Sequence, residues 1–156
     1  MEINKKILLN FINENMDNIE LIKSSYINLL KELTECNEMS LEIFMNNLIK
    51  IHNMGIIVIA YIGSFNSNDF EIIGSGTIII EPKIIRNCKN VGHIEDIVVK
   101  TNYRGKKISQ DILSYLKKYA YENNCYKIIL DCEDSITNVY KKNEFEVKGI
   151  QMAIYF

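Results

Sequence analysis

Two adjacent acidic residues, Glu95 and Asp96, lie inside an otherwise apolar run that is typical of a β-strand over residues 92–100. Side chains alternate along a strand, so the pattern predicts that Ile94, Asp96 and Val98 share one face. A carboxylate among apolar side chains is costly to bury unless it is paired or hydrogen-bonded. The pair therefore indicates either an internal ion pair or a site that holds a cationic group such as an amine.

A basic turn follows this strand at once. Residues 104–109 read Arg-Gly-Lys-Lys-Ile-Ser and open a helix predicted over residues 106–123. A helix start offers backbone N–H groups without partners and the positive end of the helix dipole, which suits a phosphate. The alternative is a solvated basic helix start. Carboxylates in a strand beside an anion cradle fit an enzyme that holds a phosphorylated cofactor next to an amine.

Further candidates stand apart from this stretch. Lys83, Arg86 and Lys127 are basic residues in a chain whose net charge is −2, and they suit an anionic substrate. Lys127 fits equally well as an exposed lysine on a strand without a binding role. Tyr140, one of nine tyrosines, carries a hydroxyl that can donate a proton, although a packing role is the simpler interpretation.

Hydrophobic periodicity and turn residues predict the elements that position these side chains. Strands are predicted over residues 3–12 (where a short helix is the alternative), 54–65, 70–81, 92–100, 126–132 and from 145 onward. Helices are predicted over residues 17–33, 40–51, 106–123 and 133–143. The strand, helix and strand from residue 92 to 132 have the length of a parallel crossover. Gly74 and Gly76 inside a strand predict a bulge or the close approach of another backbone.

Length and composition describe one domain over residues 1–156. The hydrophobic content of 47% and the charged content of 24% are typical of a soluble globular protein. A net charge of −2 produces no field that would attract nucleic acid or a membrane surface. The four cysteines form no Cys-x-x-Cys pair, so we expect thiols in the cytoplasm and no metal site.

Four blocks of sequence carry a resemblance to a known family. They are Gly-His-Ile-Glu-Asp-Ile-Val-Val (92–99), Tyr-Arg-Gly-Lys (103–106), Cys-Tyr-Lys-Ile-Ile-Leu-Asp-Cys (125–132) and Gly-Ile-Gln-Met (149–152). The strand, Arg-Gly-Lys turn and helix resemble the acetyl-CoA site of the GNAT superfamily. Within it, the blocks are similar to the glucosamine 6-phosphate N-acetyltransferase family, densely so from about residue 72 to the end.

The resemblance implies an α+β GNAT fold, with a mixed, mostly antiparallel sheet flanked by helices on both faces. It implies a cytoplasmic homodimer that acetylates the 2-amine of glucosamine 6-phosphate with acetyl-CoA, in UDP-N-acetylglucosamine biosynthesis. The catalytic candidates are Glu95, Asp96, Asp131 and Tyr140. The cofactor candidates are Asp96, Ile97, Val98, Arg104, Gly105, Lys106, Lys107, Ile108, Ser109 and Tyr140. The substrate candidates are Thr34, Lys83, Arg86, Glu95, Asp96, Tyr126 and Lys127.

The family assigns roles to several of these residues. The Tyr140 hydroxyl reaches the sulfur of CoA, and Asp131 orients the attacking amine. The backbone at Asp96 and Ile97 meets the acetyl carbonyl, and a bulge in the strand there would free an N–H group for the developing oxyanion.

The chain departs from the family pattern at Lys107, Ser109, Ile136 and Tyr155. Glycine or a small residue is usual at the first two positions, a cofactor-binding asparagine at the third, and an arginine for the partner subunit's sugar phosphate at the fourth. A lysine at position 107 predicts a turn that avoids a glycine-only conformation.

Two other functions compete with this interpretation. An acetyltransferase of the same fold could act on another amine, such as a polyamine or a protein lysine. A polyamine site would be rich in carboxylates, whereas Lys83, Arg86 and Lys127 suit an anion. The incomplete glycine pattern also fits an acyl-CoA-binding module without catalysis, although Glu95, Asp131 and Tyr140 are retained.

Overall fold

The computed structural model describes residues 2–156 and contains a five-stranded sheet with the strand order β1-β2-β3-β4-β5. The strands are β1 (Asn4–Ile7), β2 (Gly55–Ile62), β3 (Glu71–Glu81), β4 (Asn90–Val99) and β5 (Cys125–Ile129). Neighbouring strands are antiparallel except for β4 and β5, which run parallel. The predicted mixed, mostly antiparallel sheet is confirmed, and so is the parallel crossover.

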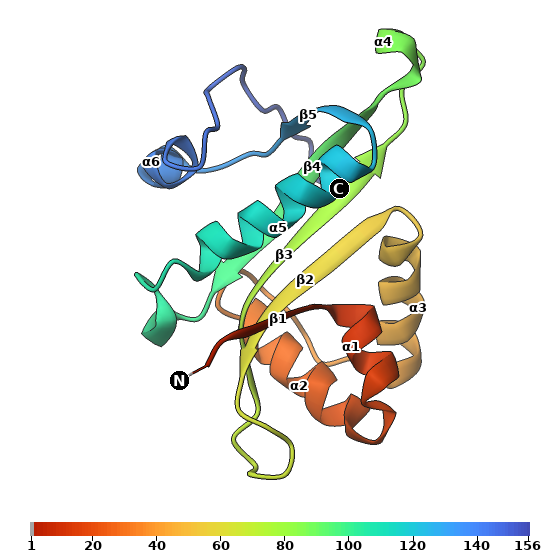
Figure 1. Ribbon diagram of the computed structural model, residues 1–156, viewed down its shortest axis with the longest axis vertical. Helices are drawn as coiled ribbons and strands as arrows, with labels where there is room; N and C mark the ends of the chain where they lie inside the picture. Colours follow the sequence, from red (N-terminus) through yellow and green to blue (C-terminus); the bar gives the residue numbers. More distant parts are fainter. Residues whose placement is uncertain (1) are drawn as a thin grey trace.

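Helices cover both faces of this sheet, as Figure 1 shows. They are α1 (Leu8–Glu14), α2 (Ile19–Leu30), α3 (Leu41–His52), α4 (Ile85–Cys88), α5 (Ile108–Glu122) and α6 (Thr137–Lys141). Short 3-10 turns occupy Met16–Asn18, Thr101–Tyr103 and Asp134–Ile136. One apolar core lies between the sheet and α1, α2 and α3, and a second lies between the sheet and α5.

Helix α5 packs close to the sheet because two glycines leave room for it. Its apolar residues recur at helical spacing and are buried: Ile108, Ile112, Leu113, Leu116 and Ala120. A Cβ atom on Gly76 would lie 2.8 Å from Cγ2 of Ile112 and 2.4 Å from Cδ1 of Ile97. The close approach predicted from the strand glycines is therefore confirmed.

The N-terminal elements agree with the prediction in most respects. The first segment contains both alternatives, since the strand Asn4–Ile7 continues directly into α1. Ser40 caps α3, because its hydroxyl accepts a hydrogen bond of 3.2 Å from the backbone N–H of Ile43. Helix α2 ends at Leu30 rather than at residue 33, and this leaves Leu33 and Thr34 in the connection to α3.

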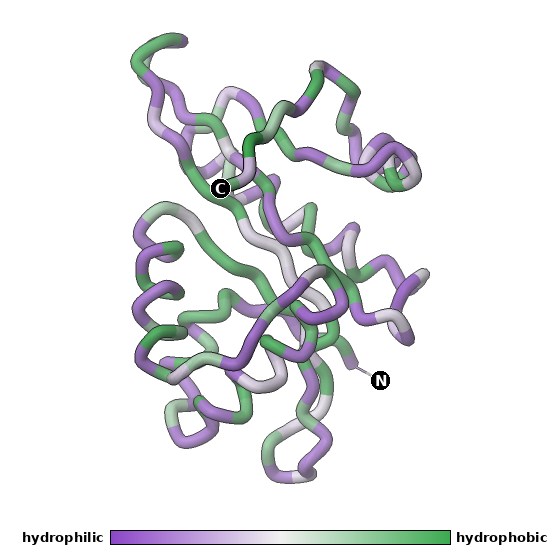
Figure 2. Tube along the Cα trace, turned by 180° about the vertical axis from the view of Figure 1, so that it is seen from behind, coloured by the Kyte–Doolittle hydropathy of each residue, from purple (hydrophilic) through white to green (hydrophobic). Residues whose placement is uncertain are grey.

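The C-terminal segment differs from the prediction. Residues 142–156 of the described chain form no helix or strand, so the strand expected from residue 145 onward is wrong. Its apolar side chains beyond Phe145 are strongly exposed, among them Ile150 and Met152. Figure 2 shows hydrophobic residues along the tube that leads to the C-terminus. Strand β5, the last of the sheet, has no strand on its outer side within residues 2–156, and the tail does not fill that place.

Within residues 2–156, no helix combines the length and the apolar character needed to cross a bilayer.

Candidate active site

A cavity of about 650 Å³ opens where the α2–α3 connection, the middle of β4 and the segment after β5 meet. Its lining residues are Leu33, Thr34, Ile94, Glu95, Asp96, Ile97, Leu130, Asp131, Cys132, Glu133, Asp134, Ile136, Tyr140 and Gln151. The four residues predicted to be catalytic line this one cavity, together with the substrate candidate Thr34. The structure thus brings together residues that are up to 106 positions apart, from Thr34 to Tyr140.

A bulge interrupts β4 at the cavity wall. Thr77 of β3 pairs with Glu95 and Ser75 pairs with Val98, so that Asp96 and Ile97 together oppose one residue, Gly76. Asp96 has a φ of 52°, in the left-handed region. The predicted bulge is confirmed. Because a bulged strand leaves backbone groups out of the ladder, this wall can present an N–H group to a substrate.

The bulge also overturns one prediction about β4. Strict alternation placed Ile94, Asp96 and Val98 on the same face. The extra residue reverses the alternation, and Ile94 packs in the core under α5 while Val98 packs in the core under α1 and α2. Asp96 is exposed to the cavity instead of following Ile94 into the core.

Carboxylates gather at the inner wall of the cavity. Partial burial raises the pKa of Glu95, and the negative charges of Asp96 and Asp131 raise it further. Asp131 accepts a hydrogen bond of 2.9 Å from Nε2 of Gln151, which fixes its carboxylate toward the C-terminal segment. Such a wall attracts a cation and can accept its proton. Gln151 had no role in the sequence prediction, although it lies in one of the blocks that carried the resemblance.

The raised pKa of Glu95 predicts that Glu95→Gln stabilises the fold at neutral pH. A raised folded-state pKa means that ionisation costs the folded state stability, and this cost appears as the pH rises through the raised value. We expect the melting temperature of the variant to rise by about 1–2 °C at pH 7, a small effect because water screens this exposed side chain. The difference should vanish at a pH where both states are protonated.

Glu144→Gln is the matched control with the opposite sign. Lys117 donates a hydrogen bond of 2.7 Å to Glu144 and lowers the pKa of that carboxyl. Loss of the Glu144 charge should therefore lower the melting temperature at neutral pH. Thermal melts of both variants across the acidic pH range check the pair, and a melting temperature of Glu95→Gln at or below that of the wild type would contradict the assignment.

Tyr140 is half-buried at the edge of the cavity. Its ring packs edge-on against Phe145, with centroids 6.1 Å apart and an interplanar angle of 83°. Burial raises the pKa of the Tyr140 phenol, and Cys132 adds to the shift. The hydroxyl is therefore protonated at neutral pH and can act as a donor. Ile136, which stands where the family carries an asparagine, lies in the same cavity wall.

The basic turn lies between the end of β4 and the first residue of α5, Ile108. Arg104 is held by a hydrogen bond of 3.1 Å from its Nε to the carbonyl oxygen of Val99. Gly105 and Lys107 both have left-handed backbones, with φ of 77° and 64°. Lys107 avoids a glycine-only conformation as predicted, but it adopts a left-handed backbone that favours glycine. The turn keeps the backbone path that glycine would adopt, and the first N–H groups of α5 lack partners inside the helix.

Lys107→Gly should stabilise the protein. The left-handed conformation costs a non-glycine residue about 1–2 kcal/mol, and glycine loses about 0.5–1 kcal/mol of backbone entropy in return. The expected net gain is about 0.5–1 kcal/mol, which is a rise of roughly 1–4 °C in the melting temperature. Lys106→Gly removes the same charge at a residue without a positive φ and should be neutral or destabilising. Calorimetric melts compare the two, and equal effects would rule out the backbone explanation.

The basic substrate candidates do not line the cavity. Lys83 pairs with Glu81, which also binds Nε2 of His93 at 2.7 Å. Arg86 and Lys127 both lie over the ring of Tyr126, at 5.8 Å and 5.7 Å from its centroid.

These basic residues lie near the start of β4 and β5, where Lys127 pairs with Val91. Asp96 is five residues further along β4, a separation of about 16 Å at 3.3 Å per residue. The chain therefore holds its carboxylates and its basic cluster at separate places.

Residues 28–145 match the Acetyltransferase (GNAT) family. Glucosamine 6-phosphate N-acetyltransferase 1 of Dictyostelium discoideum is 41% identical to this chain and covers 83% of it, with 82% of that protein aligned. The glucosamine 6-phosphate N-acetyltransferase of Arabidopsis thaliana is 35% identical, covering 86% of this chain and 89% of that protein. A solved structure of the Arabidopsis thaliana enzyme matches with a TM-score of 0.84 at 29% identity and covers 100% of this chain and 99% of that one. The chain therefore belongs to the glucosamine 6-phosphate N-acetyltransferases of the GNAT family.

Proposed function

We propose that this protein transfers acetyl from acetyl-CoA to the 2-amine of D-glucosamine 6-phosphate, giving N-acetyl-D-glucosamine 6-phosphate and CoA. The reaction is a step toward UDP-N-acetylglucosamine. One observation carries the proposal: a single cavity joins a bulged strand, a carboxylate wall and a protonated tyrosine, and the same strand leads into a helix start suited to a pyrophosphate. The names of the similar proteins from Dictyostelium discoideum and Arabidopsis thaliana supply the acceptor.

In a ternary complex the amine attacks the thioester directly, and each residue of the cavity has a separate role in this step. Glu95 and Asp131 hold the ammonium group and take up its proton, because only the neutral amine is nucleophilic. The bulge at Asp96 and Ile97 donates an N–H group to the acetyl oxygen as negative charge develops there. The C–N bond forms while the C–S bond breaks, the nitrogen releases its second proton to water, and Tyr140 gives its proton to the departing sulfur. A proton from the solvent then restores the neutral Tyr140 hydroxyl.

The basic residues enter this scheme through a homodimer. Within residues 2–156 the outer side of strand β5 is open, and the exposed apolar side chains of residues 147–156 offer a segment that a second copy could pair with. Two such copies would let Lys83, Arg86 and Lys127 of one subunit reach the sugar phosphate in the cavity of the other. Sedimentation velocity tests the assembly: a monomer at micromolar concentration would contradict it.

We place the enzyme in the cytoplasm, where the four cysteines remain thiols, and we expect neither nucleic acid nor a membrane as a partner. Imaging of a tagged chain tests the location.

A thiol-release assay with acetyl-CoA tests the reaction. The acceptors are glucosamine 6-phosphate, spermidine and a lysine peptide, each compared with buffer alone. We expect release with the amino sugar far above the other acceptors. A preference for spermidine or the peptide would assign the chain to another amine, and binding of acetyl-CoA without release would indicate a module without catalysis.

A further inference from the structure

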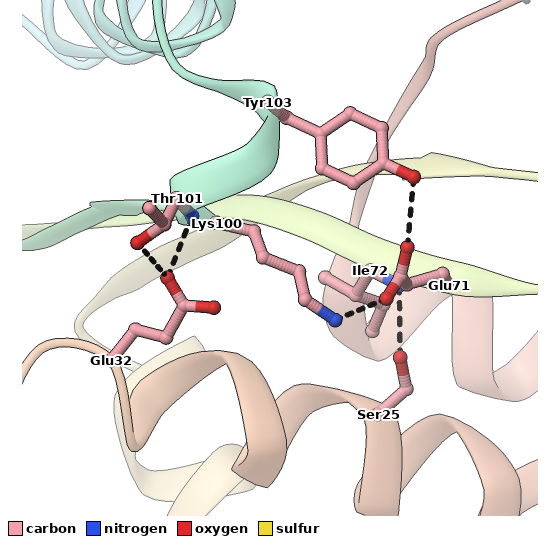
Figure 3. Close-up of polar contacts among 7 residues, drawn as sticks. All are labelled: Ser25, Glu32, Glu71, Ile72, Lys100, Thr101 and Tyr103. Carbon is pink, nitrogen blue, oxygen red and sulfur yellow. Dashed lines mark hydrogen bonds and ion pairs between the residues drawn. The ribbon is translucent and has the colours of Figure 1, made fainter.

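A carboxylate that the mechanism does not use connects two distant parts of the site. Glu32 lies just beyond the end of α2, and its Oε2 accepts two hydrogen bonds from Thr101, at the end of β4. The backbone N–H of Thr101 donates at 2.7 Å and its hydroxyl donates at 2.8 Å. Figure 3 shows this bridge beside the neighbouring contacts of Lys100 and Tyr103. The two residues are 69 positions apart in the chain.

The neighbours of this bridge belong to opposite halves of the site. On one side, Leu33 and Thr34 directly follow Glu32 and line the cavity where the acceptor amine is expected. On the other side, Thr101 begins a 3-10 turn that leads to Arg104 and the phosphate turn of residues 104–109. One carboxylate therefore joins the acceptor side of the cavity to the cofactor side.

The contact has the character of a cap. The first N–H group of a helical turn has no partner inside the turn, and Glu32 supplies one for Thr101. The hydroxyl and the N–H of Thr101 lower the pKa of Glu32, and the charges of Lys100 and Arg104 lower it further. Glu32 is therefore ionised at neutral pH, and hydrogen bonds to an ionised acceptor are stronger than neutral ones.

A second group of contacts holds α2 and the turn after β4, which carry the two sides of the bridge, against β3. Glu71 pairs with Lys100 and accepts a hydrogen bond of 3.1 Å from the hydroxyl of Tyr103. The Ser25 hydroxyl of α2 accepts a hydrogen bond of 2.8 Å from the backbone N–H of Ile72. Because α2 and the turn are both anchored to the same strand, Glu32 spans a gap of fixed width.

We propose that Glu32 is a positioning residue that fixes Leu33 and Thr34 relative to the phosphate turn, so that an anion on the turn orders the acceptor side of the cavity. The inference deepens the proposed function, on which it rests for the identity of the acceptor. The coupling itself needs only an anion at residues 104–109.

Hydrogen exchange tests the coupling with 3′-phosphoadenosine 5′-diphosphate as the probe. This molecule carries the pyrophosphate of CoA but lacks the pantetheine arm, so it cannot touch Thr34 directly. In the wild type we expect slower exchange both at residues 104–110 and at residues 31–36. In Glu32→Ala the protection at 104–110 should remain, while the protection at 31–36 should fall to less than about half.

Two further variants separate this role from a loss of structure. Glu32→Gln keeps an oxygen that accepts from Thr101 and should restore most of the protection at residues 31–36. Glu38→Ala is the matched control, because Glu38 lies in the same connection and pairs with Lys31 at 2.9 Å without touching Thr101. It should behave as the wild type.

Kinetics supply the second readout. With saturating acetyl-CoA, Glu32→Ala should raise the KM for glucosamine 6-phosphate by about 3–10-fold and change kcat much less. A wild type that binds the probe without protection at residues 31–36, or a Glu32→Ala variant that keeps full protection, overturns the inference. Failure of the probe to protect the turn overturns it as well. Absence of turnover with glucosamine 6-phosphate overturns the proposed function alone and leaves the exchange result standing.

Discussion

Glucosamine without its phosphate is expected to lose at least about 10²-fold in kcat/KM relative to glucosamine 6-phosphate. Any two charge-assisted contacts out of the three candidates Lys83, Arg86 and Lys127 contribute about 1.5–3 kcal/mol each, and about 1.4 kcal/mol corresponds to a factor of ten. Initial rates of thiol release with the two sugars measure the ratio. Equal turnover of the two acceptors would show that these residues do not bind the substrate phosphate.

Substitution of a single basic residue should reduce this discrimination. Lys127→Met keeps a long side chain without its charge and should lower kcat/KM for the phosphorylated sugar by about 10-fold or more. It should leave the rate with glucosamine nearly unchanged. Lys118→Met is the control, because Lys118 lies on α5 and pairs only loosely with Glu122, at 3.7 Å. An equal loss with both sugars would mean that Lys127 supports the fold rather than the phosphate.

The separation of the basic cluster from the cavity predicts complementation between subunits. A heterodimer of one Lys127→Met chain and one Tyr140→Phe chain contains one site with both defects and one site with neither. Random mixing gives about half heterodimers, so the mixture should recover about a quarter of the wild-type activity. Activity no higher than the average of the two parent variants would place Lys127 and Tyr140 in the same subunit's site, or in no shared site.

The sequence alone predicted the elements whose residues contact near neighbours in the chain. The apolar spacing of residues 108–120 defined α5, and Ser40 marked the start of α3 through its hydrogen bond to Ile43. The number of residues between β4 and β5 predicted the parallel crossover. The helix and its cap depend on residues a few positions apart, and the crossover depends only on the length of one continuous segment, so the pattern in the chain contains them.

The details of β4 depend on its neighbours and could be predicted only in part. Gly74 and Gly76 indicated a close approach, and the bulge opposite Gly76 was expected from the family. Which residues point into the cavity follows from the exact position of the extra residue, because one insertion exchanges the two faces beyond it. Alternation alone therefore placed Ile94 and Val98 on the same side incorrectly.

Two other features could not be predicted from the conformational preferences of single residues. Lysine rarely adopts a positive φ, yet Lys107 does, because the path from the end of β4 into α5 imposes it. The tail of residues 145–156 has the composition of a strand but no partner strand in the part of its own chain that the structure describes. A sheet requires two strands, and a sequence does not show whether the second belongs to another subunit.

Tyr140→Phe is expected to lower kcat by about 10–10²-fold and to leave the KM for both substrates nearly unchanged. The hydroxyl acts as the sulfur departs, so its contribution belongs to the transition state rather than to binding. General-acid assistance is typically worth about 10²–10⁴-fold, and the low end is expected because a CoA thiolate is a fairly good leaving group. Phenylalanine keeps the edge-on packing against Phe145, so the melting temperature should change little.

A matched substitution and a change of leaving group isolate the acid role. Tyr119→Phe removes another half-buried hydroxyl, whose pKa is also raised by burial but which does not line the cavity, and it should leave kcat unchanged. With an acetyl thioester of a more acidic thiol, Tyr140→Phe should lose less activity, because a weaker base needs less protonation as it leaves. A loss that is equal for all thioesters, or one confined to the KM for acetyl-CoA, would make Tyr140 a binding residue and would leave the departing thiolate to be protonated by water.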